Sequence, residues 1–244
     1  MSREEILKRL ENDNDYYGEF GKQFISNSDI DALINNPAAF KKHEVTLPIL
    51  QGRYFHTLIL EPEKLGDMMI VKASSRNTNI YKDAIAESGE QLLLLEKDIE
   101  LLKRLADKLM SNFEMYELIS YAGNVYEKPA IGEIHGAQWK AKADIFGPEY
   151  VIDLKTTGDI GKFKRSAWNY NYDSQAYVYQ TLFGKPMVFI VACKETEQIG
   201  MYQCSPEFLE RGNAKVIDAV IAWNKFYGPD ASLDPNDYVK QEIL

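Results

Sequence analysis

Three charged residues in the stretch WKAKADIFGPEYVIDLKTT have the types and spacing for metal-dependent chemistry: Asp144, Asp153 and Lys155. The pattern predicts two strands on either side of a turn at residues 147–150. A two- or a four-residue loop gives the same register, with Asp144 opposite Asp153 and Lys142 opposite Lys155. Because side chains alternate along a strand, all four lie on one face of the expected sheet.

The opposite face of the same two strands is apolar, which fixes the register by burial. It carries Ala141, Ala143, Ile145, Ile152 and Leu154. Two carboxylates that face each other on a sheet repel. A divalent cation between them removes that repulsion, and oxygen ligands suit magnesium or manganese. The bland alternative is a solvated strand face with a surface ion pair, because the Asp-x-Lys pattern alone is common.

A third acidic residue extends the pattern to the preceding strand. His135 and Gly136 suit a two-residue hairpin turn, since both tolerate positive φ. That turn places Glu127 opposite Asp144, so three acids align across three strands. A longer loop of odd length would instead turn Glu127 to the other face.

This arrangement suits phosphodiester hydrolysis. A metal ion polarises a phosphoryl oxygen and lowers the pKa of an attacking water. Carboxylates hold such an ion, and a lysine beside the water orients it or stabilises charge on the phosphate. Asp153 and Lys155 share a strand face, so one short segment supplies both groups.

The elements that must position these residues follow from the periodicity of apolar residues. A helix starts at Ser26-Asn27-Ser28 and is interrupted at Asn35-Asn36-Pro37. An amphipathic helix with apolar positions from Leu95 to Phe113 begins near residue 92. The remaining expected helices are 50–60, 174–183 and 206–227, and the expected strands are 125–134, 137–146, 150–157, 187–193 and 199–204.

The bulk composition indicates an ordinary globular chain. It has 244 residues, of which 45% are apolar and 27% are charged. We expect one domain over 1–244, with a mainly helical part (1–120), a core (121–227) and a tail (228–244). The two cysteines form no CxxC pair, which argues against a zinc or iron–sulfur site. No signal peptide or membrane-length apolar run is present, so we expect a cytoplasmic protein.

The net charge of −9 argues against a broad basic surface that coats nucleic acid. A cleft can still be locally basic, and bound divalent cations neutralise part of the acidity. Six basic residues near the motifs are candidates for phosphate contacts: Arg53, Lys140, Lys142, Lys162, Lys164 and Arg165.

Several separated segments together resemble one family. In order, they are SNSDIDALINNPAAFKK, GRYFHTLILEPEKL, Glu127 in VYEKP, WKAKADIF, VIDLKTT and YNYDSQAYVYQ. From about residue 26 to 227 the chain resembles the PD-(D/E)XK exonucleases of the exodeoxyribonuclease VIII type, which phages and prophages encode. Ala143 stands where the general signature has proline before its first acid.

The resemblance implies a restriction-endonuclease-like α/β core, with a central mixed sheet flanked by helices and a helical N-terminal elaboration. It assigns to the metal site Asp144, Asp153, His56, Glu127 and Leu154. Lys155 and Gln175 join the two aspartates in the catalytic group. The expected DNA-binding residues are Tyr179, Arg53, Lys142, Lys164 and Arg165. Gln175 and Tyr179 share a helix face, and packing explains the tyrosine equally well.

The activity implied by the resemblance is Mg2+- or Mn2+-dependent degradation, 5′ to 3′, of one strand of linear duplex DNA from its end. Such enzymes act in phage-type recombination, commonly assemble as rings and work with a single-strand annealing protein. Two alternatives stay open. The chain is a PD-(D/E)XK endonuclease or the nuclease subunit of a repair complex, or it is an inactive nuclease fold used for DNA binding or assembly.

Overall fold

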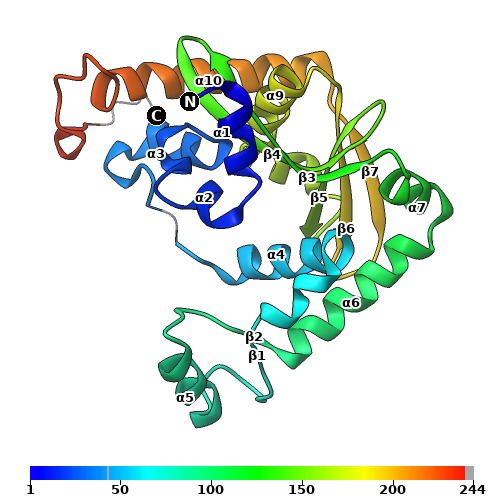
Figure 1. Cartoon of the computed structure of the whole chain (residues 1–244). Coiled ribbons are helices and arrows are strands. Elements are labelled where there is room, and N and C mark those ends of the chain that lie inside the picture. Colours follow the sequence, from blue (N-terminus) through cyan, green and yellow to red (C-terminus); the bar gives the residue numbers. More distant parts are fainter. Residues whose placement is uncertain (43, 240–244) are drawn as a thin grey trace.

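A five-stranded sheet forms the centre of the computed structural model, which describes residues 1–42 and 44–239 (Figure 1). The strand order is β3-β4-β5-β6-β7, and only β5 and β6 are parallel among these neighbours. The strands are β3 (Val125–Ile134), β4 (Ala137–Phe146), β5 (Val151–Thr157), β6 (Met187–Cys193) and β7 (Ile199–Gln203). Helices cover both faces, so the predicted mixed sheet flanked by helices is confirmed.

The β3–β4 hairpin forms at the predicted two-residue turn. His135 and Gly136 have φ values of 52° and 82°, the left-handed conformations that a type I′ turn requires. The first pair beyond the turn is Ile134 with Ala137. The hairpin therefore has the predicted register, which places Glu127 opposite Asp144.

The β4–β5 pair also has the predicted register, but only at its start. Ile145 pairs with Ile152 and Phe146 with Val151, and the recorded pairing stops there. The strands diverge beyond this point. Neither of the expected pairs beyond this point, Asp144 with Asp153 and Lys142 with Lys155, belongs to the ladder, because it ends before it reaches them.

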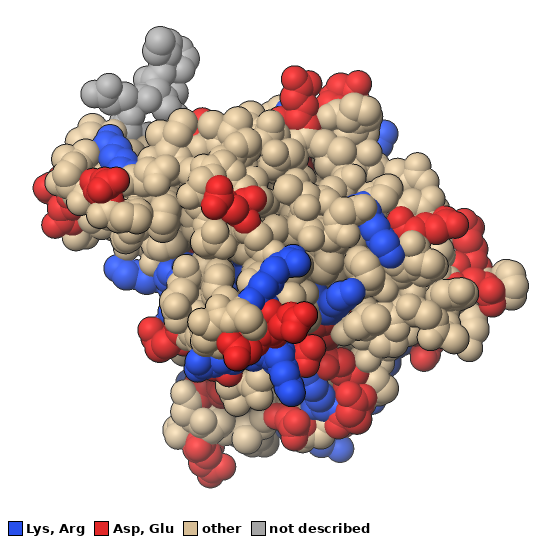
Figure 2. Space-filling view, turned by 45° about the horizontal axis from the view of Figure 1, so that its top comes forward, with Lys and Arg blue, Asp and Glu red and all other residues tan. Residues whose placement is uncertain are grey.

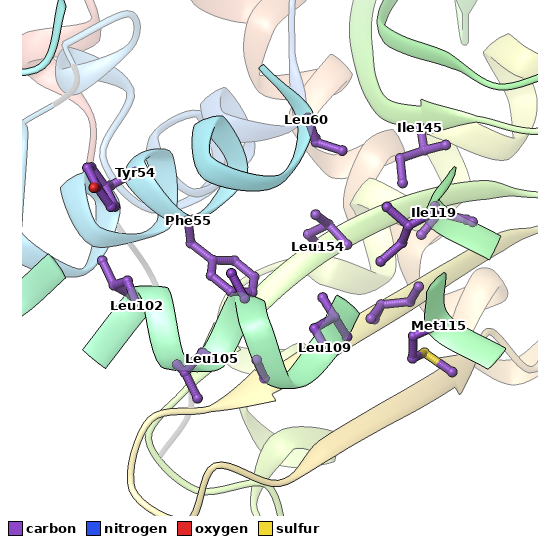
Figure 3. Close-up of a cluster of buried hydrophobic side chains, with 14 of the residues drawn as sticks. Tyr54, Phe55, Leu60, Leu102, Leu105, Leu109, Met115, Ile119, Ile145 and Leu154 are labelled. Atoms are coloured by element: carbon purple, nitrogen blue, oxygen red, sulfur yellow. The ribbon is translucent and has the colours of Figure 1, made fainter. Parts of the chain in front are cut away.

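One face of the sheet is covered by α4 (Leu47–Leu60), α6 (Glu96–Ser111) and α7 (Phe113–Ser120). Figure 3 shows Phe55 of α4 pointing into this layer among side chains of α6 and the sheet. Ile145 and Leu154, predicted to form the core face, are both fully buried here. The packing of α4 against β5 brings His56, the residue after Phe55, to the point where β4 and β5 diverge.

The other face is covered by α8 (Phe163–Asn169), α9 (Tyr172–Phe183) and α10 (Pro206–Phe226), with α3 (Ile30–Asn35) beside α10. Two apolar clusters join these helices to the sheet. One contains Trp139, and the other contains Phe163 and Phe189. Phe189 pairs with Asp153 across β5 and β6, so this face is the one that carries the acids.

The N-terminal segment packs on the hairpin. It contains α1 (Arg3–Leu10), α2 (Asp13–Tyr17) and the short 3-10 helices η1 (Gly21–Gln23), η2 (Asn27–Asp29) and η3 (Pro37–Ala39). Leu10, Tyr16 and Phe24 form a small core with Ile131 of β3. Ile25 then bridges to Trp139 in a parallel arrangement. The segment thus lies against β4 and its lysines.

A small lobe extends from the end of α4, at the bottom of Figure 1. It consists of η4 (Pro62–Asp67), β1 (Ile70–Val71), α5 (Asn79–Ser88) and β2 (Leu94–Leu95), with β1 and β2 parallel. Its own apolar cluster contains Val71, Tyr81, Leu93 and Leu95. The pattern of apolar residues did not predict this lobe.

Two helix predictions need correction. The expected helix from residue 92 to 113 begins at Glu96, because Leu95 belongs to β2, and it ends at Ser111. Asn112 then caps a new helix by accepting a hydrogen bond from the Met115 N–H, and Phe113 is 78% exposed. Helix α8 was not expected. The helix predicted at 50–60 begins three residues earlier, at Leu47, and residues 240–244 of the predicted tail lie outside the described residues.

Within the described residues, no helix combines the length and the apolar character that crossing a bilayer requires.

Replacing Phe55 tests whether α4 is held by its buried face. Phe55→Ala should lower the free energy of unfolding by about 3–5 kcal/mol, because a fully buried aromatic ring leaves a cavity. Phe113→Ala removes the same group from an exposed site and should change it by less than about 0.5 kcal/mol. Urea unfolding followed by circular dichroism measures both. Equal effects would contradict this account of α4.

Candidate active site

Three potential metal ligands converge where β4 and β5 separate. His56 comes from α4, Asp144 from β4 and Asp153 from β5. One ligand atom of each lies within 4.8 Å of the others. Both aspartates are buried, and His56 is partly buried. The predicted meeting of the two acids therefore occurs, and the family-derived histidine joins them.

Asp144 is held by the backbone that the diverging strands leave unpaired. The N–H of Leu154 donates a 2.7 Å hydrogen bond to Asp144 Oδ2. The carboxylate thus takes the place of a ladder acceptor, which satisfies a buried backbone donor. Burial alone would raise the pKa of Asp144, but the charge and hydrogen bond of His56 hold it below its ordinary value.

His56 links the backbone of Leu154 to the carboxylate of Asp144. Its Nε2 lies 2.6 Å from the carbonyl oxygen of Leu154, which can only accept, so Nε2 carries the proton. Its Nδ1 faces Asp144 Oδ2 at 3.3 Å. Burial opposes protonation of the ring, yet the negative charge of Asp144 raises the pKa of His56 to about 9.

Asp153 is bound from two sides. Gln175 of α9 donates a hydrogen bond to its Oδ1, and Lys155 Nζ lies 2.5 Å from its Oδ2. Burial raises the pKa of Asp153, whereas the charge of Lys155 opposes that rise. Burial would lower the pKa of Lys155, but Asp153 raises it to about 12, so the lysine is cationic at neutral pH.

The donor set fits a divalent cation. Buried carboxylate oxygens and an imidazole nitrogen are ligands that magnesium, manganese and similar ions accept. Asp153 Oδ2 has a nearby cation in Lys155 but no hydrogen bond of good geometry, so it retains a lone pair for a ligand. Asp144, Asp153 and His56 would hold the ion, with the Leu154 carbonyl beside them.

Glu127 lies at the edge of this group rather than within it. The pairs on either side of it, Tyr126–Ile145 and Lys128–Ala143, keep the register that places it opposite Asp144. It nevertheless has a φ of 48°, a left-handed conformation that is unusual inside a strand. Burial and the charge of Asp144 raise the pKa of Glu127 to about 8. The Glu127 side chain is near enough to interact electrostatically with Asp144 but is not part of the three-residue cluster.

The structure separates the six basic candidates into two groups. Lys142 and Lys140 are buried: Lys142 Nζ lies 2.6 Å from Asp13 Oδ1, and Lys140 donates to the carbonyl oxygen of Tyr16. Burial lowers the pKa of Lys140 to about 8. Both lysines are thus engaged within the protein, which disfavours contact with a phosphate, and their part in DNA binding stays a prediction. Arg53, Lys162, Lys164 and Arg165 are exposed.

Figure 2 shows acidic and basic side chains interspersed on the face in view, rather than a continuous basic field. This agrees with the net charge of −9. This face therefore offers no broad attraction for a polyanion.

Tyr179 has a structural place. Its hydroxyl donates a 3.0 Å hydrogen bond to the carbonyl oxygen of Lys142, and its ring packs beside Phe183. This contact ties α9 to β4 one helical turn from Gln175. Packing and DNA binding were equally good expectations for Tyr179, and the observed contacts favour packing.

Sequence reasoning did not predict two contacts beside the site. Asp13 of α2 binds both Lys142 and Lys64, the latter at 3.0 Å, and no local pattern links a residue so early in the chain to β4. Tyr172 places its ring under Lys155, with Nζ 4.9 Å from the ring centroid. Its position at the start of α9, near the Gln175 motif, was the available signal.

A family model and one solved structure agree with this architecture. A family model described as a PDDEXK-like domain of unknown function (DUF3799) matches residues 22–225. No curated protein matches the chain in sequence. A crystal structure titled "Putative exonuclease", from Eubacterium rectale, has a TM-score of 0.65 at 17% identity, covering 96% of this chain and 95% of that one. The structure of SSO0001 has a TM-score of 0.39 at 16% identity, covering 89% and 84%.

The metal site can be tested without any assay of activity. Asp144→Asn and Asp153→Asn should each weaken manganese binding more than about a hundredfold, because even residues behind metal ligands cost 10–100-fold when replaced. Asp218→Asn, an exposed position on α10, should leave the affinity unchanged. Isothermal titration calorimetry with manganese chloride gives the affinities. Unaltered manganese affinity in both active-site variants would show that these residues do not form the metal site.

Proposed function

The chain belongs to the DUF3799 family of PDDEXK-like domains, and from this premise we propose that it is a divalent-metal-dependent deoxyribonuclease. The observation that carries the proposal is the buried convergence of Asp144, Asp153 and His56 beside the cationic Lys155. The family and the fold support a nuclease, and nucleases of this fold use divalent metals. The choice of DNA as substrate and of magnesium as the ion is our proposal.

Each side chain has a chemical part in this proposal. A bound divalent cation would polarise a phosphoryl oxygen and lower the pKa of a water. Lys155, whose pKa of about 12 keeps it charged, stabilises negative charge that develops on the phosphate. Gln175 fixes the orientation of Asp153, and the Leu154 N–H fixes that of Asp144. These bonds hold both carboxylates in place before a substrate arrives.

We propose more specifically that the enzyme degrades one strand of linear duplex DNA from its end, 5′ to 3′, with Mg2+ or Mn2+. The support is the likeness of the sequence motifs to exodeoxyribonuclease VIII-type enzymes and the structural similarity to the Eubacterium rectale protein, which is described as a "Putative exonuclease". A PD-(D/E)XK endonuclease or a repair-complex subunit is the alternative. It has the same site and differs in needing no free end.

The biological setting is proposed on the resemblance alone. It would be phage-type recombination in the cytoplasm of a bacterial host, with the gene carried by a phage or prophage. The partners would be duplex DNA ends, a single-strand annealing protein and further copies of the chain in a ring.

Digestion of linear and covalently closed duplex DNA tests the function. With magnesium, the wild type should degrade the linear form and spare the circle, and EDTA should stop the reaction. Lys155→Ala should lower the rate of DNA degradation at least about a hundredfold, because the phosphate loses the cationic side chain that stabilises its developing charge. Lys103→Ala, exposed on α6, is the charge-matched control and should retain full activity.

The alternatives give different results in the same experiment. Cleavage of the closed circle would identify an endonuclease. A wild type that binds manganese but cuts neither DNA would overturn the nuclease proposal and leave an inactive module.

The exposed basic pair on α8 predicts a change in salt dependence. A Lys164→Ala/Arg165→Ala double variant should bind duplex DNA more weakly. The negative slope of the logarithm of the binding constant against the logarithm of the salt concentration should become shallower by about 2. A Lys103→Ala/Lys108→Ala variant removes the same charge from α6 and should keep the wild-type slope. Fluorescence anisotropy at several salt concentrations measures the slope. Identical slopes in the two variants would exclude α8 from the DNA contact.

A further inference from the structure

Two exposed aromatic side chains follow each other on the face of the sheet that carries the active site. Trp168, near the end of α8, is 49% exposed, and Tyr170, just after it, is 67% exposed. We call this pair the aromatic ridge. Large rings so close together and so open to solvent are not explained by core packing.

The aromatic ridge is linked to Lys155 through the ring of Tyr172. The ring centroids of Tyr170 and Tyr172 are 6.1 Å apart. The ring of Tyr172 in turn lies 4.9 Å from Lys155 Nζ. Tyr170 thus lies next to the ring that contacts Lys155.

The backbone beneath the aromatic ridge is fixed from two sides. Lys215 Nζ of α10 donates hydrogen bonds to the carbonyl oxygen of Trp168, to Asn171 Oδ1 and to Asp173 Oδ1, all at 2.8–2.9 Å. Asn27 donates a 3.1 Å hydrogen bond to the carbonyl oxygen of Asn171. These bonds hold Asn171 in a left-handed conformation with φ of 57°.

The approach of α10 to the first turn of α9, directly after this loop, leaves no room for a side chain. A Cβ at Gly212 would lie 2.1 Å from the carbonyl oxygen of Asp173. The first turn of α9 is therefore packed tightly on α10, while Trp168 and Tyr170 just before it stay exposed. A rigid backbone that presents an open ring is preorganised for binding, because little conformational freedom remains to be lost.

Positive charge accompanies the rings. The guanidinium of Arg211 lies 4.1 Å from the centroid of the Trp168 ring. Lys164 and Arg165 are exposed on α8, which leads into the loop. Proteins that bind single-stranded nucleic acid combine stacking rings with cations that follow the backbone in this way.

We propose that Tyr170, assisted by Trp168, stacks on an unpaired base of the DNA strand that flanks the phosphate at Lys155. This rests on the proposed function and extends it: the site receives a strand whose bases are unpaired beside the scissile bond. Stacking needs only a π-face, so the contact accepts any base sequence. The substrate strand of a duplex must therefore separate from its complement before it reaches Lys155.

Binding of a fluorescein-labelled single strand of about 12 nucleotides tests the proposal, within the range of site sizes for such proteins. Every protein carries Lys155→Ala, so the DNA is not consumed during anisotropy measurements with magnesium. Tyr170→Ala should weaken binding about tenfold, which corresponds to the lower half of the range for one stacked base. Tyr170→Phe keeps the ring and should bind normally. Tyr116→Ala, 47% exposed on α7 across the sheet, is the control.

Oligonucleotides with one abasic nucleotide at each position in turn locate the stacked base. With Tyr170 present, one position should lose affinity about as much as Tyr170→Ala does, and in that variant the same abasic position should cause no further loss. Equal binding by Tyr170→Ala and the Tyr116→Ala control would overturn the stacking proposal. So would a loss of affinity in Tyr170→Ala that simply adds to the loss at every abasic position, or a loss that Tyr170→Phe does not restore.

The outcome is separable from that of the digestion assay. Cleavage by the wild type together with normal binding by Tyr170→Ala would reject the aromatic ridge and keep the nuclease. Absence of single-strand binding by the parent protein also rejects the ridge. A wild type that binds the strand through Tyr170 without cutting DNA would retain the ridge and reject the nuclease.

Discussion

The burial of two carboxylates on neighbouring strands is the constraint on which the arrangement of the molecule depends. An unpaired buried carboxylate costs several kcal/mol, and a second one beside it adds repulsion. Asp144 and Asp153 are accommodated because four different groups reach them: a backbone N–H, an imidazole, an ammonium and a side-chain amide. These groups come from α4, β5 and α9, so helices on both sides of the sheet are needed at one point.

Divergence of β4 from β5 makes this convergence possible. A continuous ladder would occupy the Leu154 N–H and carbonyl with partners on β4. Because the recorded pairing ends at Ile145–Ile152, both backbone groups are free to bind Asp144 and His56. Helix α4 then serves two purposes in adjacent residues. Phe55 anchors it in the apolar layer (Figure 3), and His56 reaches Leu154 and Asp144 at the opening. The stability of that layer and the geometry of the site are therefore linked.

The sheet and its acids were predictable from the sequence because their determinants are local. Strand alternation, the His135-Gly136 turn and an apolar reverse face specify which residues oppose each other. The burial of Lys142 was not predictable, because its partner Asp13 is 129 positions away. The helix break at Asn112 was hidden by apolar periodicity that continues across it, while β1 and β2 are too short to show alternation. His56 needed the family resemblance, since one histidine on a helix carries no signal of its own.

The long-range attachment of the N-terminal segment has a consequence for the order of assembly. Ile25 exchanges backbone hydrogen bonds with Gln138 and Lys140, and Asp13 binds Lys142. During synthesis at about 5–20 residues per second, the ribosome needs roughly 6 to 26 s to make β4 after α2. Until then the apolar side chains of α1 and α2 have no strand to cover, and they are open to chaperones. The segment that is made first thus cannot dock until β4 has been made, and the two lysines of β4 leave water only at that step.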